Sequence, residues 1–184
     1  AVGRLRAMRI ASSAHGPFDP HLPTLWSHGA QAVAVALDFM GGEPEYTSAV
    51  LAETKALDAG VGETVDLRFD FPGEEDVRIR LSNMAEERLY VALHFDKVVM
   101  VYDTKADSPL KLHLPTDHYA DPTDPGQAME VPEEDVDANV VMTFAMAIAG
   151  GVNDSGSLDL GVDTVSTLTR CQAALDERAE SKAP

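Results

Sequence analysis

The sequence predicts a mainly all-β protein, an antiparallel sandwich or barrel with a jelly roll as the favoured topology and one or two short helices. Two observations carry this prediction. Apolar and charged residues alternate over residues 65–71 and again over 77–81, which is the pattern of strands with one buried face. The segments that favour strands also follow one another without a regular β-α-β order. The length of 184 residues is that of one domain of ordinary size.

The first segment, residues 1–29, is predicted to be an extended N-terminal arm. It contains Pro17, Pro20 and Pro23, and prolines at this spacing disfavour a helix. It also holds the only tryptophan, Trp26, which would fasten the arm to an edge of its own domain or to a neighbouring subunit. Residues 30–184 are then predicted to form a single β-barrel domain.

The remaining elements follow in order along this domain. Residues 32–39 alternate small and large apolar side chains, which favours a strand between two packed layers. Residues 47–59 favour a helix that begins at Thr47 or Ser48 and ends at Gly60. The other predictions are hairpins over 65–71 with 77–81 and over 89–95 with 98–102, strands at 110–114, 140–148 and 157–165, and a helix at 167–179. Residues 115–137 form a long, acidic, proline-rich loop in this scheme.

The charge of the chain is strongly negative and evenly spread. There are 31 acidic and 14 basic residues, for a net charge of −17. Such an excess repels itself at ordinary ionic strength, whereas near 1 M salt the screening length falls to about 3 Å. The composition therefore indicates a protein adapted to concentrated salt. It also opposes nucleic-acid binding, which needs clustered Lys and Arg.

Sequence motifs of common enzymes are absent. There is no Gly-x-Ser-x-Gly, His-Glu-x-x-His or phosphate-loop motif, and Gly60-Val-Gly62 precedes a strand rather than a helix. A single cysteine, Cys171, excludes an intrachain disulfide and a cysteine-based zinc site, and it is predicted to be a small buried residue. No stretch is apolar over the roughly 18 residues that a membrane helix needs. The sequence alone therefore predicts no catalytic residue, no enzyme activity and no cofactor.

Six histidines and one acidic segment are the candidates for a site. His15, His21 and His28 are expected to be solvated on the arm, and His94 to belong to the core. His113 and His118 could form a hydrolase site if they converge with Asp117 or Asp121. Asp117, Asp121 and Asp124 are weak candidates for a calcium site, and the acids that follow them are Glu130, Glu133, Glu134, Asp135 and Asp137. The favoured interpretation of this segment is a hydrated acidic surface, so that any bound cations would be structural.

The dispersed acidity, the low lysine count, the length and the β-rich pattern with an N-terminal arm resemble the small major capsid protein of tailless icosahedral haloarchaeal viruses. This resemblance implies a single upright jelly-roll barrel in the capsid of a virion, which assembles with copies of itself and with a larger capsid subunit. It also implies an internal membrane, whose lipid phosphates Arg4, Arg6 and Arg9 of the arm would contact.

Three other functions remain open from the sequence. One is a calcium- or carbohydrate-binding β-module of a secreted halophilic protein, and another is the small hydrolase described above. The third is a protein that mimics DNA. This function would explain the acidity, but not why arginines are spread evenly among the acidic residues. An extracellular or cytoplasmic location in a halophile is the alternative to the virion.

Overall fold

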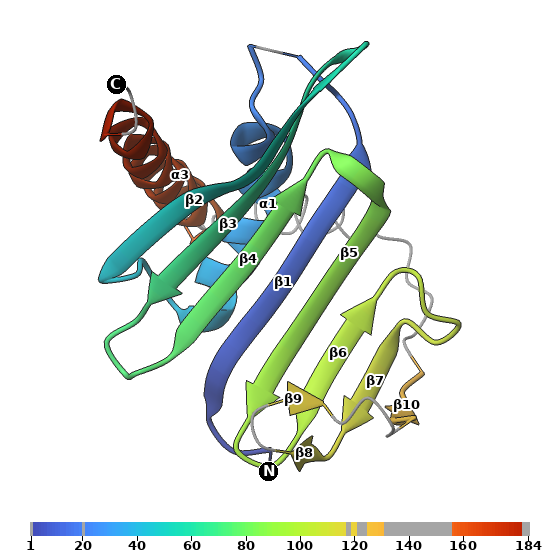
Figure 1. Ribbon diagram of the computed structural model, residues 1–184. Helices are drawn as coiled ribbons and strands as arrows, with labels where there is room; N and C mark the ends of the chain where they lie inside the picture. Colours follow the sequence, from blue (N-terminus) through green and yellow to red (C-terminus); the bar gives the residue numbers. More distant parts are fainter. Residues whose placement is uncertain (1, 20, 117–118, 121–124, 131–155, 182–184) are drawn as a thin grey trace, which may run out of the picture.

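The computed structural model describes residues 2–19, 21–116, 119–120, 125–130 and 156–181. Its body is an eight-stranded mixed sheet in the order β10-β7-β6-β5-β1-β4-β3-β2 (Figure 1). The strands of this sheet are β1 (Leu5–His15), β2 (Tyr46–Leu57), β3 (Gly60–Asp70), β4 (Asp76–Ser82), β5 (Met84–Phe95), β6 (Val99–Asp103), β7 (Leu110–His113) and β10 (Gln127–Ala128). A separate two-stranded sheet pairs β8 (Pro115–Thr116) with β9 (Tyr119–Ala120).

The two described helices, α1 (Thr24–Met40) and α3 (Gly156–Ser181), lie on the same face of the large sheet. Figure 1 shows both of them behind the strands, so neither covers the opposite face of β1 to β4. The jelly-roll prediction is therefore wrong: the fold is mixed α/β, with one large sheet and both described helices on the same side of it.

Strand β1 lies in the middle of this sheet, parallel to β4 and antiparallel to β5. Met8 is opposite Val77 on one side and Leu93 on the other, and all three side chains are buried. The segment predicted as an extended arm therefore supplies a central strand and the start of α1. These residues do not form a surface arm that reaches a neighbour, because their apolar side chains complete the core.

The strand predicted at residues 32–39 is wrong, since these residues belong to α1. Their Ala-Val-Ala-Val-Ala-Leu run suits a helix as well as a strand, because a short apolar run does not distinguish the two and alanine has the highest helix propensity. Leu25, Val33 and Leu37 are buried on one side of the helix. The helix ends at Gly41, whose left-handed φ of 78° lets its N–H bond to the carbonyl of Leu37.

The helix predicted at residues 47–59 is also wrong, because this segment is strand β2. It pairs with β3 in antiparallel register from Tyr46–Asp70 to Leu57–Gly60, with one irregularity. The pairing satisfies the backbone hydrogen bonds that a helix would have made internally, and it places Ala49 in the core against the helices. Tertiary pairing overrides the local helical pattern here.

Several other predictions are confirmed. The hairpins over 65–71 with 77–81 and over 89–95 with 98–102 are the antiparallel pairs β3–β4 and β5–β6, and the strand at 110–114 is β7. Residues 167–179 are helical as predicted, but α3 begins at Gly156 and so replaces the strand predicted at 157–165. The strand predicted at 140–148 lies outside the described residues.

The core fills the space between the sheet and the helices. Its largest fully buried side chains include Phe69, Met8, Leu25, Ile79 and Leu168. Cys171 of α3 is buried in the same cluster, as predicted. No helix in the described part of the chain is long and apolar enough to cross a membrane.

Candidate functional site

The connection between β1 and α1 is held by one buried amide, Asn83, which lies between β4 and β5. Its Nδ2 donates to the carbonyls of Pro17 at 3.2 Å and Val61 at 3.3 Å, and its Oδ1 accepts the backbone N–H of Glu63 at 2.7 Å. The backbone carbonyl of Asn83 also accepts the N–H of Gly16 at 2.9 Å. One residue that is only 3% exposed thus joins the β1–α1 loop to the β2–β3 hairpin.

Glu63 of β3 completes this junction by capping α1. Pro23, which precedes the helix, has no polar side chain to offer as a cap, and a carboxylate oxygen of Glu63 accepts the N–H of Thr24 at 3.1 Å. A carboxylate at a helix N-terminus also meets the positive end of the helix dipole. A residue distant in sequence therefore fixes where the helix begins.

Gly60 shows how closely the hairpin approaches the loop. Its φ is +138°, and a Cβ there would collide with the carbonyl oxygen of Phe18. Two histidines border the same loop: the ring of His15 meets that of Phe18 edge-on at 5.1 Å, and His28 Nε2 of α1 lies 3.2 Å from the Gly16 carbonyl. The loop is therefore packed from both sides.

A groove of about 490 Å³ opens beside this junction, between the start of α1, the edge strand β2 and the end of α3. Its apolar floor includes Leu25, Val65 and Leu175. Its polar groups are Glu53, Thr54, Glu63, Gln172, Asp176 and Arg178. A volume in this range suits a small organic ligand.

A relay of hydrogen bonds crosses the groove wall from α1 to α3. Trp26 Nε1 donates to Gln172 Oε1 at 3.1 Å, and Gln172 Nε2 donates to Asp176 Oδ1 at 2.9 Å. The amide thereby holds the exposed Asp176 carboxylate in place at the rim of the groove. Carboxylates and an amide above an apolar floor are suited to hydroxyl groups on a carbon skeleton, since the oxygens accept O–H donors while the floor contacts C–H faces.

The residues predicted as sites from the sequence do not meet in this groove. His113 lies on β7, separated from β2 by most of the width of the sheet. His118, Asp117, Asp121 and Asp124 lie outside the described residues, so the hydrolase and calcium assignments stay predictions. Within the described ranges, no group of three or more His, Cys, Asp or Glu side chains could hold a metal ion.

Sequence reasoning missed the residues that build the junction and the groove beside it. Asn83, Glu63, Gln172 and Asp176 belong to no motif, and separate elements bring them together. The sequence gives little signal for Asn83: it follows the alternating strand segment at 77–81 and precedes Glu86 and Glu87, so its pattern is that of an ordinary polar turn.

Comparison with known proteins shows what shares this fold. No family model and no curated protein matches the sequence. A crystal structure from Magnetospirillum magnetotacticum MS-1, of a protein that carries an oxidoreductase assignment, matches with 32% identity over 92% of this chain and a TM-score of 0.82. UDP-N-acetylglucosamine 3-dehydrogenase GnnA from Acidithiobacillus ferrooxidans matches with 14% identity over 96% of the chain and a TM-score of 0.73. The 3-ketoreductase KijD10 from Actinomadura kijaniata, in complex with NADP, matches with 13% identity over 95% and a TM-score of 0.70.

This chain spans little more than half of each of these proteins, 55%, 55% and 53% of their respective lengths. The neighbours are oxidoreductases, so the capsid prediction is wrong, and co-assembly with capsid subunits and membrane contact of the arm lose their support. The expectations of no enzyme activity and no cofactor are corrected as well, since these neighbours are described as oxidoreductases and the structure of KijD10 contains NADP. The calcium- or carbohydrate-binding module and the small hydrolase are supported no better.

Among the described residues, neither the β1–α1 connection nor the β2–β3 hairpin forms a site for the phosphates of a dinucleotide. The sequence has no Gly-x-Gly-x-x-Gly motif, and the strand-to-helix connection from β1 to α1 carries Gly16 followed by Pro17, Pro20 and Pro23. Gly60 and Gly62 lie at the start of β3, within a hairpin. Glu63 already occupies the N-terminus of α1, and a second anion there would be repelled.

Proposed function

We propose that this chain is the sheet-bearing part of an NAD(P)-dependent oxidoreductase that acts on a hydroxyl or keto group of a sugar. The observation that carries the proposal is the 32% identity to an assigned oxidoreductase over 92% of the chain. The sugar class is supported by two neighbours that are described as a UDP-N-acetylglucosamine 3-dehydrogenase and a 3-ketoreductase.

In this proposal the dinucleotide supplies the hydride chemistry and is held by residues outside this chain. The chain itself would bind and orient the substrate in the groove between α1, β2 and α3. Asp176, fixed by Gln172, would accept a hydrogen bond from a sugar hydroxyl, and Leu25 and Leu175 would contact the ring. Orientation of this kind lowers the barrier because the reacting carbon is held in place before reaction.

The test is steady-state turnover of the complete polypeptide that contains this chain, with a panel of sugars and nucleotide sugars. Asp176→Asn should lower kcat/KM by about tenfold or more, which is the usual effect of removing a charge-assisted hydrogen bond. Glu177→Gln is the matched control, because Glu177 is the next residue of α3, is likewise exposed and does not line the groove.

The two parts of the proposal fail in different ways. If the Asp176→Asn and Glu177→Gln proteins reduce NAD(P) equally well, the oxidoreductase function stands but the groove is not the substrate site. If the wild-type polypeptide shows no NAD(P)-dependent turnover of any of these sugars, the proposed function itself is wrong.

A further inference from the structure

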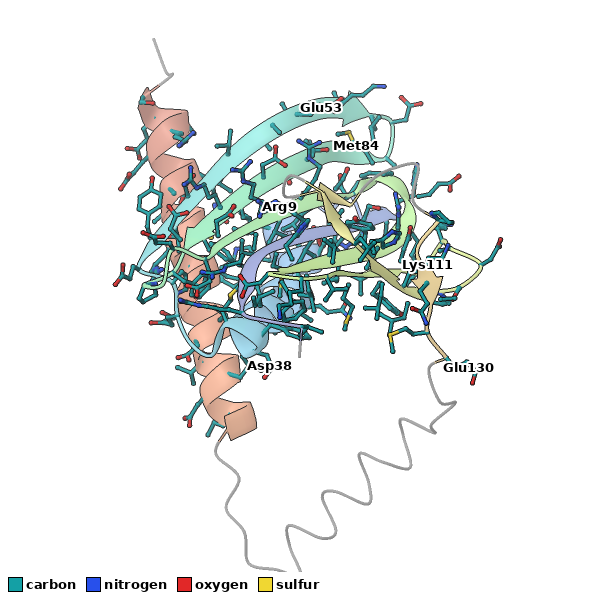
Figure 2. The ribbon with its side chains drawn as sticks, turned by 90° about the horizontal axis from the view of Figure 1, so that it is seen from below. Arg9, Asp38, Glu53, Met84, Lys111 and Glu130 are labelled. Carbon is teal, nitrogen blue, oxygen red and sulfur yellow. The ribbon has the colours of Figure 1, made fainter. Side chains whose placement is uncertain are left out.

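Three arginines form a row across the open face of the sheet. Arg9 of β1 is directly opposite Arg78 of β4, and Arg78 is directly opposite Arg68 of β3. The next residue along β4, Ile79, is buried against the helices, so the arginines point to the other side. Figure 2 shows Arg9 and Asp38 of α1 on opposite sides of the sheet. This row is therefore separate from the groove described above.

The row holds more positive charge than its neighbours neutralise. Like charges directly opposite each other on a sheet are destabilising. Asp76 contacts Arg9 Nη1 at 2.9 Å and Arg78 Nε at 3.2 Å, and Asp70 contacts Arg68 Nε at 3.0 Å. Three guanidinium groups thus share two carboxylates, which leaves one excess positive charge on a chain whose net charge is −17.

The next arginine on β4 does not remove this excess, because it has its own partner. Arg80 donates to both oxygens of Asp66, from Nε at 2.7 Å and from Nη2 at 2.8 Å. This fork-to-fork pair satisfies both groups. The uncompensated charge therefore belongs to the row of Arg9, Arg78 and Arg68.

A hollow of about 580 Å³ lies over the row. Arg68 and Arg78 each donate to their aspartate through Nε, and their Nη atoms make no hydrogen bond to a described residue. Ser48 of β2 is opposite Arg68, and Tyr90 of β5 lines the hollow from the other side. Both hydroxyls are further hydrogen-bond donors. Donors of this kind around a concave surface are complementary to an oxyanion.

We propose that the row of Arg9, Arg68 and Arg78 binds a phosphate group, either as inorganic phosphate or as part of a phosphate ester. The planar Nη edge of an arginine matches two phosphate oxygens, and phosphate has enough oxygens to engage more than one arginine at once. The bound anion offsets the repulsion between the three guanidinium groups. Binding therefore stabilises the sheet and does not depend on the proposed oxidoreductase activity.

The experiment is isothermal titration of the chain with inorganic phosphate and with glucose 6-phosphate, in chloride buffer at constant ionic strength. Arg78→Gln should weaken binding by about tenfold or more, because it removes a charge-assisted contact at the centre of the row. Arg88→Gln is the matched control. It makes the same charge change on β5, at a residue paired with Asp103 outside the hollow, and should bind phosphate like the wild type.

Asp70→Asn provides a test in the opposite direction. It removes the carboxylate that competes for Arg68, so phosphate binding should become tighter even if Arg78→Gln fails to fold. Tighter binding of glucose 6-phosphate than of inorganic phosphate would assign the site to an ester, and the reverse to the free ion.

Three outcomes would overturn the proposal. One is the absence of phosphate binding by the wild type, and another is equal weakening by Arg78→Gln and Arg88→Gln. The third is a wild-type protein that binds no phosphate and sediments as a dimer, while the Arg78→Gln protein sediments as a monomer. This result would assign the row to contact between two copies.

Discussion

Asn83 makes three side-chain hydrogen bonds at the junction beside the groove. Replacing it with alanine leaves the N–H of Glu63 and the carbonyls of Pro17 and Val61 without their partner. Each buried polar group without a partner costs about 1–3 kcal/mol. We therefore expect Asn83→Ala to lower the free energy of unfolding by about 2–4 kcal/mol in urea denaturation.

Gln31→Ala is the control for this prediction, because Gln31 is an exposed amide on α1. It should change stability by less than about 0.5 kcal/mol. Equal, small effects of the two substitutions would show that the amide of Asn83 does not hold the loop.

Cys171 gives a second prediction at the residue scale. Burial in the core raises the pKa of its thiol from 9.0 to about 12. The folded state therefore keeps the proton at pH values where the unfolded chain loses it. The resulting stability is complete below pH 9 and is lost as the pH rises toward 12.

The corresponding measurement is the free energy of unfolding of the wild type and of Cys171→Ala, from about pH 8 up to the alkaline pH at which the protein unfolds. The variant should show a shallower fall with pH, together with a lower stability at neutral pH because a core atom is lost. Rapid reaction of the native thiol with a disulfide reagent at about pH 8 would contradict the buried position.

At the scale of elements, the packing of α1 on the sheet depends on Gly29. A Cβ at this position would lie 3.0 Å from Leu168 of α3 and 3.2 Å from Leu81 of β4. Gly29→Val should therefore separate the two helices from the sheet and destabilise the protein by about 1–3 kcal/mol.

Gly161 of α3 provides the matched comparison, since it is exposed and a Cβ at this position would meet nothing within 4 Å. Gly161→Val should be neutral or stabilising by a few tenths of a kcal/mol, because valine has the higher helix propensity. Thermal unfolding of the two variants measures the difference. A more stable Gly29→Val protein would contradict the close packing of α1 against α3.

The elements also show what can be predicted from the sequence. Strands with strict alternation, such as residues 65–71, are predictable because one face is buried and the other is charged. Residues 32–39 and 47–59 are not, because their local patterns fit both a helix and a strand. The pairing of β2 with β3 and the packing of α1 on the sheet decide between the two.

The candidate site is less predictable than the fold. Asn83, Glu63 and Gln172 come from different elements, so their juxtaposition follows from the sheet order, which no spacing in the sequence encodes. The arginine row is hidden for the same reason. Arg9 lies about seventy residues before Arg78 and becomes its neighbour only through the parallel pairing of β1 with β4.

At the scale of the whole molecule, the net charge of −17 gives a prediction about salt. Exposed ion pairs such as Arg6–Asp96 lose strength in salt, but repulsion among the excess carboxylates is screened as well and involves many more groups. The melting temperature should therefore rise as sodium chloride increases from about 0.1 M to about 2 M. A melting temperature that falls over this range would show that the ion pairs outweigh the repulsion.

We propose that the chain works as part of an NAD(P)-dependent oxidoreductase. The most direct measurement is the change in NAD(P)H absorbance when the complete polypeptide is mixed with NAD(P) and a panel of sugars and nucleotide sugars. We expect NAD(P)H to form with at least one of these sugars, or to be consumed with the corresponding keto sugar. No substrate-dependent change with either dinucleotide, from a folded polypeptide, would contradict the claim.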